Sequence, residues 1–144
     1  MPLFFLEETM IKYIINTAYG SNVYKINKVV NETKNNLSIV KRICKENLFS
    51  YEGYLAAVKY KFNKYHLIPV VINKDNIFIP TKRVRDYENI WINLPQILLI
   101  EENENQTVIT FRDYDKLVVS IKMEMLLKRV DLAGKILKYK LNIL

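Results

Sequence analysis

Hydrophobic and polar positions follow two different periods along the chain, and the period indicates the element to expect. β-branched and aromatic residues dominate residues 10–16 and again residues 23–30, with a turn-like segment at 18–22 between them. This pattern predicts a strand, a turn and a second strand. A polar loop is expected at 33–36, followed by a short strand over residues 37–44.

Two segments show the spacing of a helix instead. Ser50 is a good N-cap and Glu52 would lie in the first turn, which predicts a helix over residues 51–63. A second helix is predicted over residues 123–140, packing on the sheet. Its apolar stripe would contain Met123, Leu126, Leu127, Val130, Gly134, Leu137 and Leu141.

The remaining apolar runs are short and separated by turn signals, which is typical of strands. They lie at residues 67–72, 76–79, 90–93, 96–101, 107–112 and 117–121, and residues 82–89 form a charged loop. Pro95 requires an edge strand or a bulge. The pattern predicts an α+β fold of mainly antiparallel β-sheet with two helices, in a single domain over residues 1–144.

Composition restricts the class of protein. A chain of 144 residues, half of them hydrophobic, can bury a core without disulfides. Its one cysteine, Cys44, is expected as a buried thiol and indicates a reducing compartment. Residues 1–10 lack a basic segment and are not expected to form a signal peptide, and no apolar run is long enough to cross a bilayer. A cytoplasmic protein is therefore expected.

The net charge of +7 is concentrated in the middle of the chain. Residues 1–24 carry −1, residues 25–85 carry +9 and residues 86–144 carry −1. Such an excess favours an anionic partner. A lysine-rich and asparagine-rich composition could produce the same charge without any partner.

Candidate catalytic residues are scarce. His66 is the only histidine, and the three glycines form none of the phosphate-binding loop motifs. Asp113 and Asp115 are better explained as turn residues than as cation ligands. Tyr51, Tyr54 and Trp91 are assigned to the core, because large aromatics on a helix stripe or strand usually pack. No enzymatic activity, metal or cofactor is expected.

The basic residues of the middle region are candidates for binding nucleic acid. On one face they would neutralise phosphates, and the loop at 82–85 could place arginine in a narrow A·T-rich minor groove if it is flexible. A dispersed, solvated basic surface is the alternative. The candidate DNA-binding residues are Lys41, Arg42, Lys45, Lys59, Lys61, Lys64, Lys82, Arg83 and Arg85.

Several short motifs occur in a fixed order between residues 38 and 121. They are Ser50-Tyr51-x-Gly53, His66-x-x-Pro69, Ile77-Phe78-Ile79-Pro80-Thr81, Trp91-Ile92 and Thr107-Val108-Ile109-Thr110-Phe111. This ordered set resembles the ComK-type competence transcription factors of Gram-positive bacteria.

The resemblance implies a transcription activator that binds A·T-rich double-stranded DNA, largely through the minor groove, as a homo-oligomer. It also implies control by a proteolytic adaptor, which the best-known members bind through a tail extending beyond the position of Leu144. The loop at 82–89 is more basic than the family's loop, which is rich in serine and small residues. A rival expectation is a protein-interaction module of the same fold that does not bind DNA specifically.

Overall fold

Six antiparallel strands form the larger of two sheets in the structure, a computed structural model that describes residues 10–142. The expectation about a signal peptide therefore lies outside the described residues. The strand order is β3-β2-β1-β6-β5-β4. The strands are β1 (Ile11–Thr17), β2 (Gly20–Lys25), β3 (Lys28–Glu32), β4 (Val70–Asn73), β5 (Asn76–Pro80) and β6 (Ile90–Asn93).

Two strand boundaries differ from the sequence prediction because the backbone turns there. The strand expected over residues 23–30 is divided between β2 and β3, and Asn27 at the turn has a φ of 66°. The strand expected from residue 67 begins at Val70, since Leu67 adopts a φ of 55°. A residue in this left-handed region cannot continue an extended strand.

The smaller sheet contains β7 (Ile97–Asn103), β8 (Gln106–Phe111) and β9 (Lys116–Val119), paired antiparallel in that order. A short 3₁₀ helix, η1 (Leu94–Gln96), contains Pro95 and leads into β7. The predicted α+β class with a mainly antiparallel sheet is confirmed.

Three helices are present in the described residues: α2 (Asn36–Glu46), α3 (Tyr51–Phe62) and α4 (Met123–Asn142). Both predicted helices are confirmed, but the strand expected over residues 37–44 is wrong, because this segment forms α2. The side chain of Asn35 accepts a hydrogen bond from Ser38 N at 2.9 Å and caps the helix. The β-branched residues in this segment favour a strand by propensity, whereas burial of one helical face favours α2.

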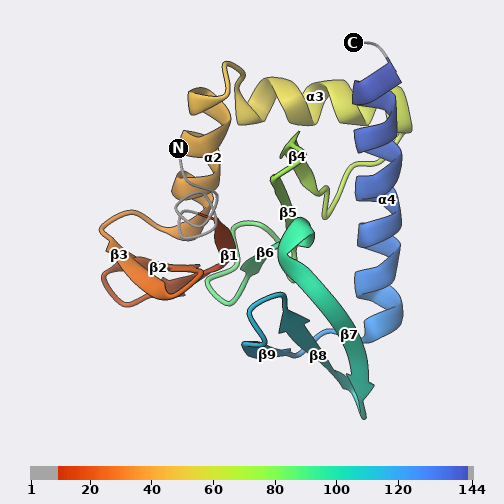
Figure 1. Ribbon diagram of the computed structural model, residues 1–144. Coiled ribbons are helices and arrows are strands. Elements are labelled where there is room, and N and C mark those ends of the chain that lie inside the picture. The colour runs from red at the N-terminus through yellow and green to blue at the C-terminus, as the bar shows by residue number, and fades with distance from the viewer. Residues whose placement is uncertain (1–9, 143–144) are drawn as a thin grey trace.

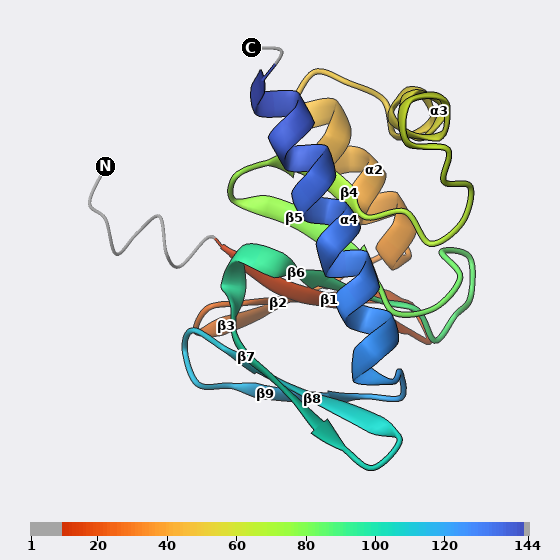
Figure 2. The same ribbon diagram turned by 90° about the vertical axis from the view of Figure 1, so that its right-hand side faces the viewer.

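The larger sheet lies between α2 and α3 on one side and the smaller sheet on the other, and α4 runs alongside both sheets (Figure 2). The central strands of the larger sheet are buried on both faces. Trp91 packs in a cluster with α2 and α3, whereas the next residue, Ile92, packs with β8, β9 and the start of α4. Figure 1 shows the smaller sheet at the opposite end of the molecule from α3. The core assignment is confirmed for Tyr51 and Trp91, which are 5% and 0% exposed.

Helix α4 packs on the sheet as expected, but its buried face coincides only partly with the predicted stripe, which shares Leu126 and the partly buried Val130 and Leu137. Its buried residues are Leu126, Arg129, Ala133 and Ile136, whereas Leu127 and Gly134 are exposed. The prediction missed the part of this face that contains Arg129, because a charged side chain is not expected on a buried face. Arg129 donates a hydrogen bond to the carbonyl of Pro80 at 2.7 Å, and burial lowers the pKa of its guanidinium.

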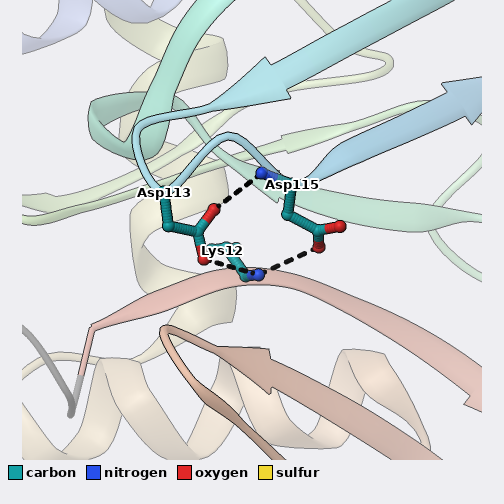
Figure 3. A network of polar contacts seen from close by, with 3 residues as sticks. All are labelled: Lys12, Asp113 and Asp115. Atoms are coloured by element: carbon teal, nitrogen blue, oxygen red, sulfur yellow. Dashed lines mark hydrogen bonds and ion pairs between the residues drawn. The ribbon is translucent and has the colours of Figure 1, made fainter.

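A buried lysine joins the two sheets (Figure 3). Lys12 on β1 lies 2.9 Å from carboxylate oxygens of both Asp113 and Asp115, which follow β8. Asp115 N also donates a hydrogen bond to Asp113 Oδ1, so the predicted turn is confirmed. Burial lowers the pKa of Lys12, but the hydrogen bonds and charges of the two aspartates outweigh it and raise this pKa above its ordinary value.

The last turns of α4 cover β4, an edge strand of the larger sheet. Lys140 Nζ donates hydrogen bonds to the carbonyls of Val71 and Ile72 at 2.7 and 3.3 Å. Cys44 is buried as expected, although on a helix, and burial raises the pKa of its thiol to about 11. None of the helices within residues 10–142 is long and apolar enough to span a membrane.

Candidate nucleic-acid interface

The loop between β5 and β6 carries three of the candidate residues, Lys82, Arg83 and Arg85. Its two ends are joined by a buried asparagine. Asn89 Oδ1 accepts hydrogen bonds from the backbone N–H groups of Thr81 and Lys82, both at 3.0 Å. The loop base is therefore rigidly defined by its own sequence.

Neighbouring elements hold the same loop from outside. Asn36 on α2 donates to the carbonyl of Asn89 at 2.6 Å, and Asn16 on β1 donates to the carbonyl of Tyr87 at 3.0 Å. Val84 packs against the core cluster that contains α2 and α3. The loop at 82–85, considered above as a flexible one, is therefore held by hydrogen bonds and packing on both sides. It presents the exposed side chains of Arg83 and Arg85 from this held backbone.

Helix α3 lies opposite this loop, and both are on the same side of the molecule (Figure 2). Gly53 N donates to Ser50 Oγ at 3.0 Å, so the predicted N-cap is confirmed. A cavity of about 660 Å³ opens between the helix and the loop. Lys59, Arg83 and Arg85 line this cavity, although they come from clusters more than twenty residues apart in the sequence.

The hydroxyl of Tyr51 is the unusual group beside this cavity. Tyr51 lines the cavity, and its hydroxyl is buried without a hydrogen-bond partner among the described residues. Burial raises the pKa of Tyr51 to about 12, while the positive charge of Arg85 opposes the rise. The charge of Arg85 in the loop therefore acts on the hydroxyl of Tyr51.

Two of the three candidate residues on α2 have acidic partners. Lys41 Nζ lies 3.0 Å from Glu52 Oε1, and Arg42 donates two hydrogen bonds to Glu32. The bonds from Arg42 lower the pKa of the Glu32 carboxyl. Lys45 is exposed in the last turn of α2, where its positive charge interacts favourably with the negative end of the helix dipole.

Two further candidates point toward α4 rather than toward the loop. Lys61 Nζ lies 4.8 Å above the ring of Tyr139. Lys64 lines a second cavity, of about 570 Å³, together with Glu124 and Asp131 of α4. Of the nine predicted residues, the structure brings Lys59, Arg83 and Arg85 together around one cavity, and half-buried Lys82 begins the same loop.

Sequence reasoning missed several residues beside these arginines. His66 lines the cavity and is exposed in the segment before β4. Tyr19 and Tyr87 line a hollow of about 470 Å³ on the other side of the loop, which also includes Arg85. The signal available in the sequence was an aromatic residue in a polar segment, Tyr19 in the turn at 18–22 and Tyr87 in the charged loop at 82–89. Within residues 10–142 no group of acids, histidine and cysteine could hold a metal ion.

The geometry can be compared with known proteins. The family model of the ComK protein matches residues 7–142, which is nearly the whole chain. No curated protein and no solved structure matches the chain. The chain belongs to the ComK family, and the suspected resemblance is confirmed. ComK is a family of competence transcription factors and not of enzymes, so membership supports a role in transcription regulation.

Proposed function

We propose, from its membership of the ComK family, that this protein is a transcription activator that binds A·T-rich double-stranded DNA as a homo-oligomer in the cytoplasm. Arg83 and Arg85 enter the minor groove, whose negative potential in A·T-rich sequence attracts arginine. The remaining lysines and Arg42 contact phosphates and supply affinity without sequence preference.

The observation that carries this proposal is the state of the two arginines. Both are exposed, and within the described part of the chain neither takes part in an ion pair. Their loop is held by hydrogen bonds at its base and along its length. A loop held in this way loses little backbone freedom on binding, and unpaired guanidinium groups displace no internal acid.

Titration against two duplexes of equal length, one A·T-rich and one G·C-rich, tests the proposal. Fluorescence anisotropy at several salt concentrations gives both affinities and the salt slope. We expect the A·T-rich duplex to bind at least about tenfold more tightly. We also expect affinity to fall steeply with salt, because bound phosphates release counterions. Equal binding of the two duplexes, or no binding, would contradict the proposal.

One observation favours the rival function, a module that binds another protein. The outer face of the smaller sheet presents Leu99 and Val118, which are 50% and 52% exposed. This face lies at the opposite end of the molecule from α3 (Figure 1). A folded protein that binds neither duplex would point to this second function.

A further inference from the structure

The cavity between α3 and the arginine loop has the charge of an anion site. Lys59, Arg83 and Arg85 line it, and no acidic residue does. These three side chains have no ion pair among residues 10–142. A single arginine can donate two parallel hydrogen bonds to a phosphate or carboxylate, so Arg83 and Arg85 are well suited to hold such a group.

The interior of the same cavity is apolar. Leu55 of α3, Ile68 before β4 and Val84 of the loop line it, together with the rings of Tyr51 and Tyr65. The volume of about 660 Å³ lies within the range of small-molecule sites in proteins. An inorganic ion would leave these walls unused, whereas a flat organic body would cover them.

The hydroxyl of Tyr51 is buried behind the wall of the cavity, where an occupant does not reach it. Tyr51 is 5% exposed and its hydroxyl has no partner in the part of the chain that the structure describes. Buried hydroxyl groups are nearly always hydrogen-bonded in folded proteins. The neighbouring Tyr54 follows this rule, because it donates to the carbonyl of Pro69 and accepts from Val71 N.

We propose that this cavity binds a nucleoside monophosphate, with the phosphate on Arg83 and Arg85 and the base against Leu55, Ile68 and Val84. The ring of Tyr51 forms part of the same wall. A phosphate carries nearly two negative charges and therefore suits three cations better than a carboxylate does. The same chemistry is offered by a free nucleotide and by a single nucleotide unit of a DNA strand.

The proposal has a regulatory consequence, which rests on the proposed function. Arg83 and Arg85 cannot contact a bound nucleotide and the minor groove at once. A free nucleotide and the A·T-rich duplex should therefore exclude one another. Binding of the nucleotide itself does not depend on whether the protein binds duplex DNA.

The direct test is a titration of the ¹⁵N-labelled protein with thymidine 5′-monophosphate, followed by amide chemical shifts. We expect saturable shifts confined to the cavity, at Tyr51, Ile68 and residues 83–85. Thymidine and inorganic phosphate should each bind at least about tenfold more weakly, because each uses half of the site.

Three variants make this test specific. Arg85→Ala should weaken nucleotide binding about tenfold or more, through loss of a charge-assisted contact. Arg83→Ala should weaken binding to a similar extent for the same reason, with an unchanged amide spectrum elsewhere. Lys138→Ala, which removes an exposed lysine of α4 outside the cavity, should leave nucleotide binding unchanged. Shifts that do not saturate, or full binding by either cavity variant, would overturn the proposal.

Two further arms identify the source of the nucleotide and the link to DNA. A short thymidine oligonucleotide that shifts the same amides and binds more tightly than the monophosphate would identify a DNA strand as the source. Weaker binding by the oligonucleotide would identify a free nucleotide. Simultaneous binding of the monophosphate and the duplex would refute the exclusion. If the duplex fails to bind at all, the proposed function fails while the nucleotide titration still decides the cavity.

Discussion

The cations on α2 and the cations on the loop at 81–89 have different surroundings. Lys41 and Arg42 each contact a glutamate, whereas Arg83 and Arg85 have no ion pair within the described residues. Both groups contribute equally to the +9 of residues 25–85. The two groups differ in their availability to an anionic partner. Such a partner must displace a glutamate from Lys41 or Arg42, whereas Arg83 and Arg85 have no acid to displace.

Lys12 extends the comparison to the interior. It has two acidic partners and is nearly buried, so its charge serves the contact between the sheets. Paired cations therefore contribute to the fold in proportion to their burial, and unpaired surface cations remain for binding. Four substitutions test this division, in order of expected effect.

The largest effect is expected from Arg83→Ala combined with Arg85→Ala. Loss of two groove contacts should remove about 2–6 kcal/mol of the preference for the A·T-rich duplex, whereas general affinity should fall less. Anisotropy with both duplexes measures this. Lys128→Ala combined with Lys135→Ala, which removes two exposed charges from α4, is the matched control. A retained preference in the arginine variant would remove the distinction between the two groups.

Asn89→Ala should show whether the arginines need a fixed loop. The substitution leaves the N–H group of Lys82 without its acceptor and that of Thr81 with only the carbonyl of Ile90, and it should lower the free energy of unfolding by about 1–3 kcal/mol. The A·T preference should fall although both arginines remain. Chemical denaturation and anisotropy measure the two effects, and exposed Asn31→Ala is the control. An unchanged preference would mean that loop order is unimportant.

Lys12→Met should affect stability and not DNA binding. The loss of two ion pairs, one to a half-exposed aspartate, should cost about 1–2 kcal/mol near neutral pH. The pKa of Lys12 is raised in the folded state, so its contribution is complete below its unfolded pKa of 10.5 and is lost as pH rises through the higher folded value.

Denaturation of wild type and Lys12→Met at several pH values measures this. The difference between the two proteins should stay constant up to pH 10 and then narrow. Lys128→Met removes an exposed lysine with an i,i+4 partner and should show almost no difference at any pH. A constant difference at high pH would mean that packing of the side chain, not its charge, joins the sheets.

The smallest effect is expected from freeing the cations of α2. Glu32→Gln combined with Glu52→Gln removes the partners of Arg42 and Lys41 and should steepen the salt slope of duplex binding by about 1–2. The A·T preference should not change. Glu101→Gln combined with Glu102→Gln alters net charge equally on distant β7, so an equal effect there would show that net charge alone matters.

Local signals predicted part of the fold well. The cap at Ser50, the periodicity of α3 and the turn at Asp113 depend on residues close in sequence, and all three were confirmed. Helix α2 was missed because Ile39, Val40 and Ile43 favour strands by propensity, while burial against the sheet decides the outcome. Its N-cap, Asn35, was the overlooked local signal.

The arrangement of charges could not be predicted in the same way. The contact of Lys12 with Asp113 spans 101 residues, and that of Arg42 with Glu32 joins a helix to a strand predicted with the wrong end. The basic clusters were visible in the sequence, but which cations keep an acid beside them depends on tertiary structure. The cavity likewise requires Ile68 and Val84 to meet across the chain.

The contact of Lys140 with β4 has a consequence for how the chain folds during synthesis. The carbonyl of Val71 receives its hydrogen bond from a residue 69 positions later, so this bond cannot form until the ribosome has made the chain as far as Lys140. At a synthesis rate of roughly 5–20 residues per second, the carbonyls of Val71 and Ile72 on the edge strand β4 remain without this partner for on the order of 3–14 s. During that interval a second nascent chain on the same messenger could pair with this edge. Arrival of the final turn of α4 closes it.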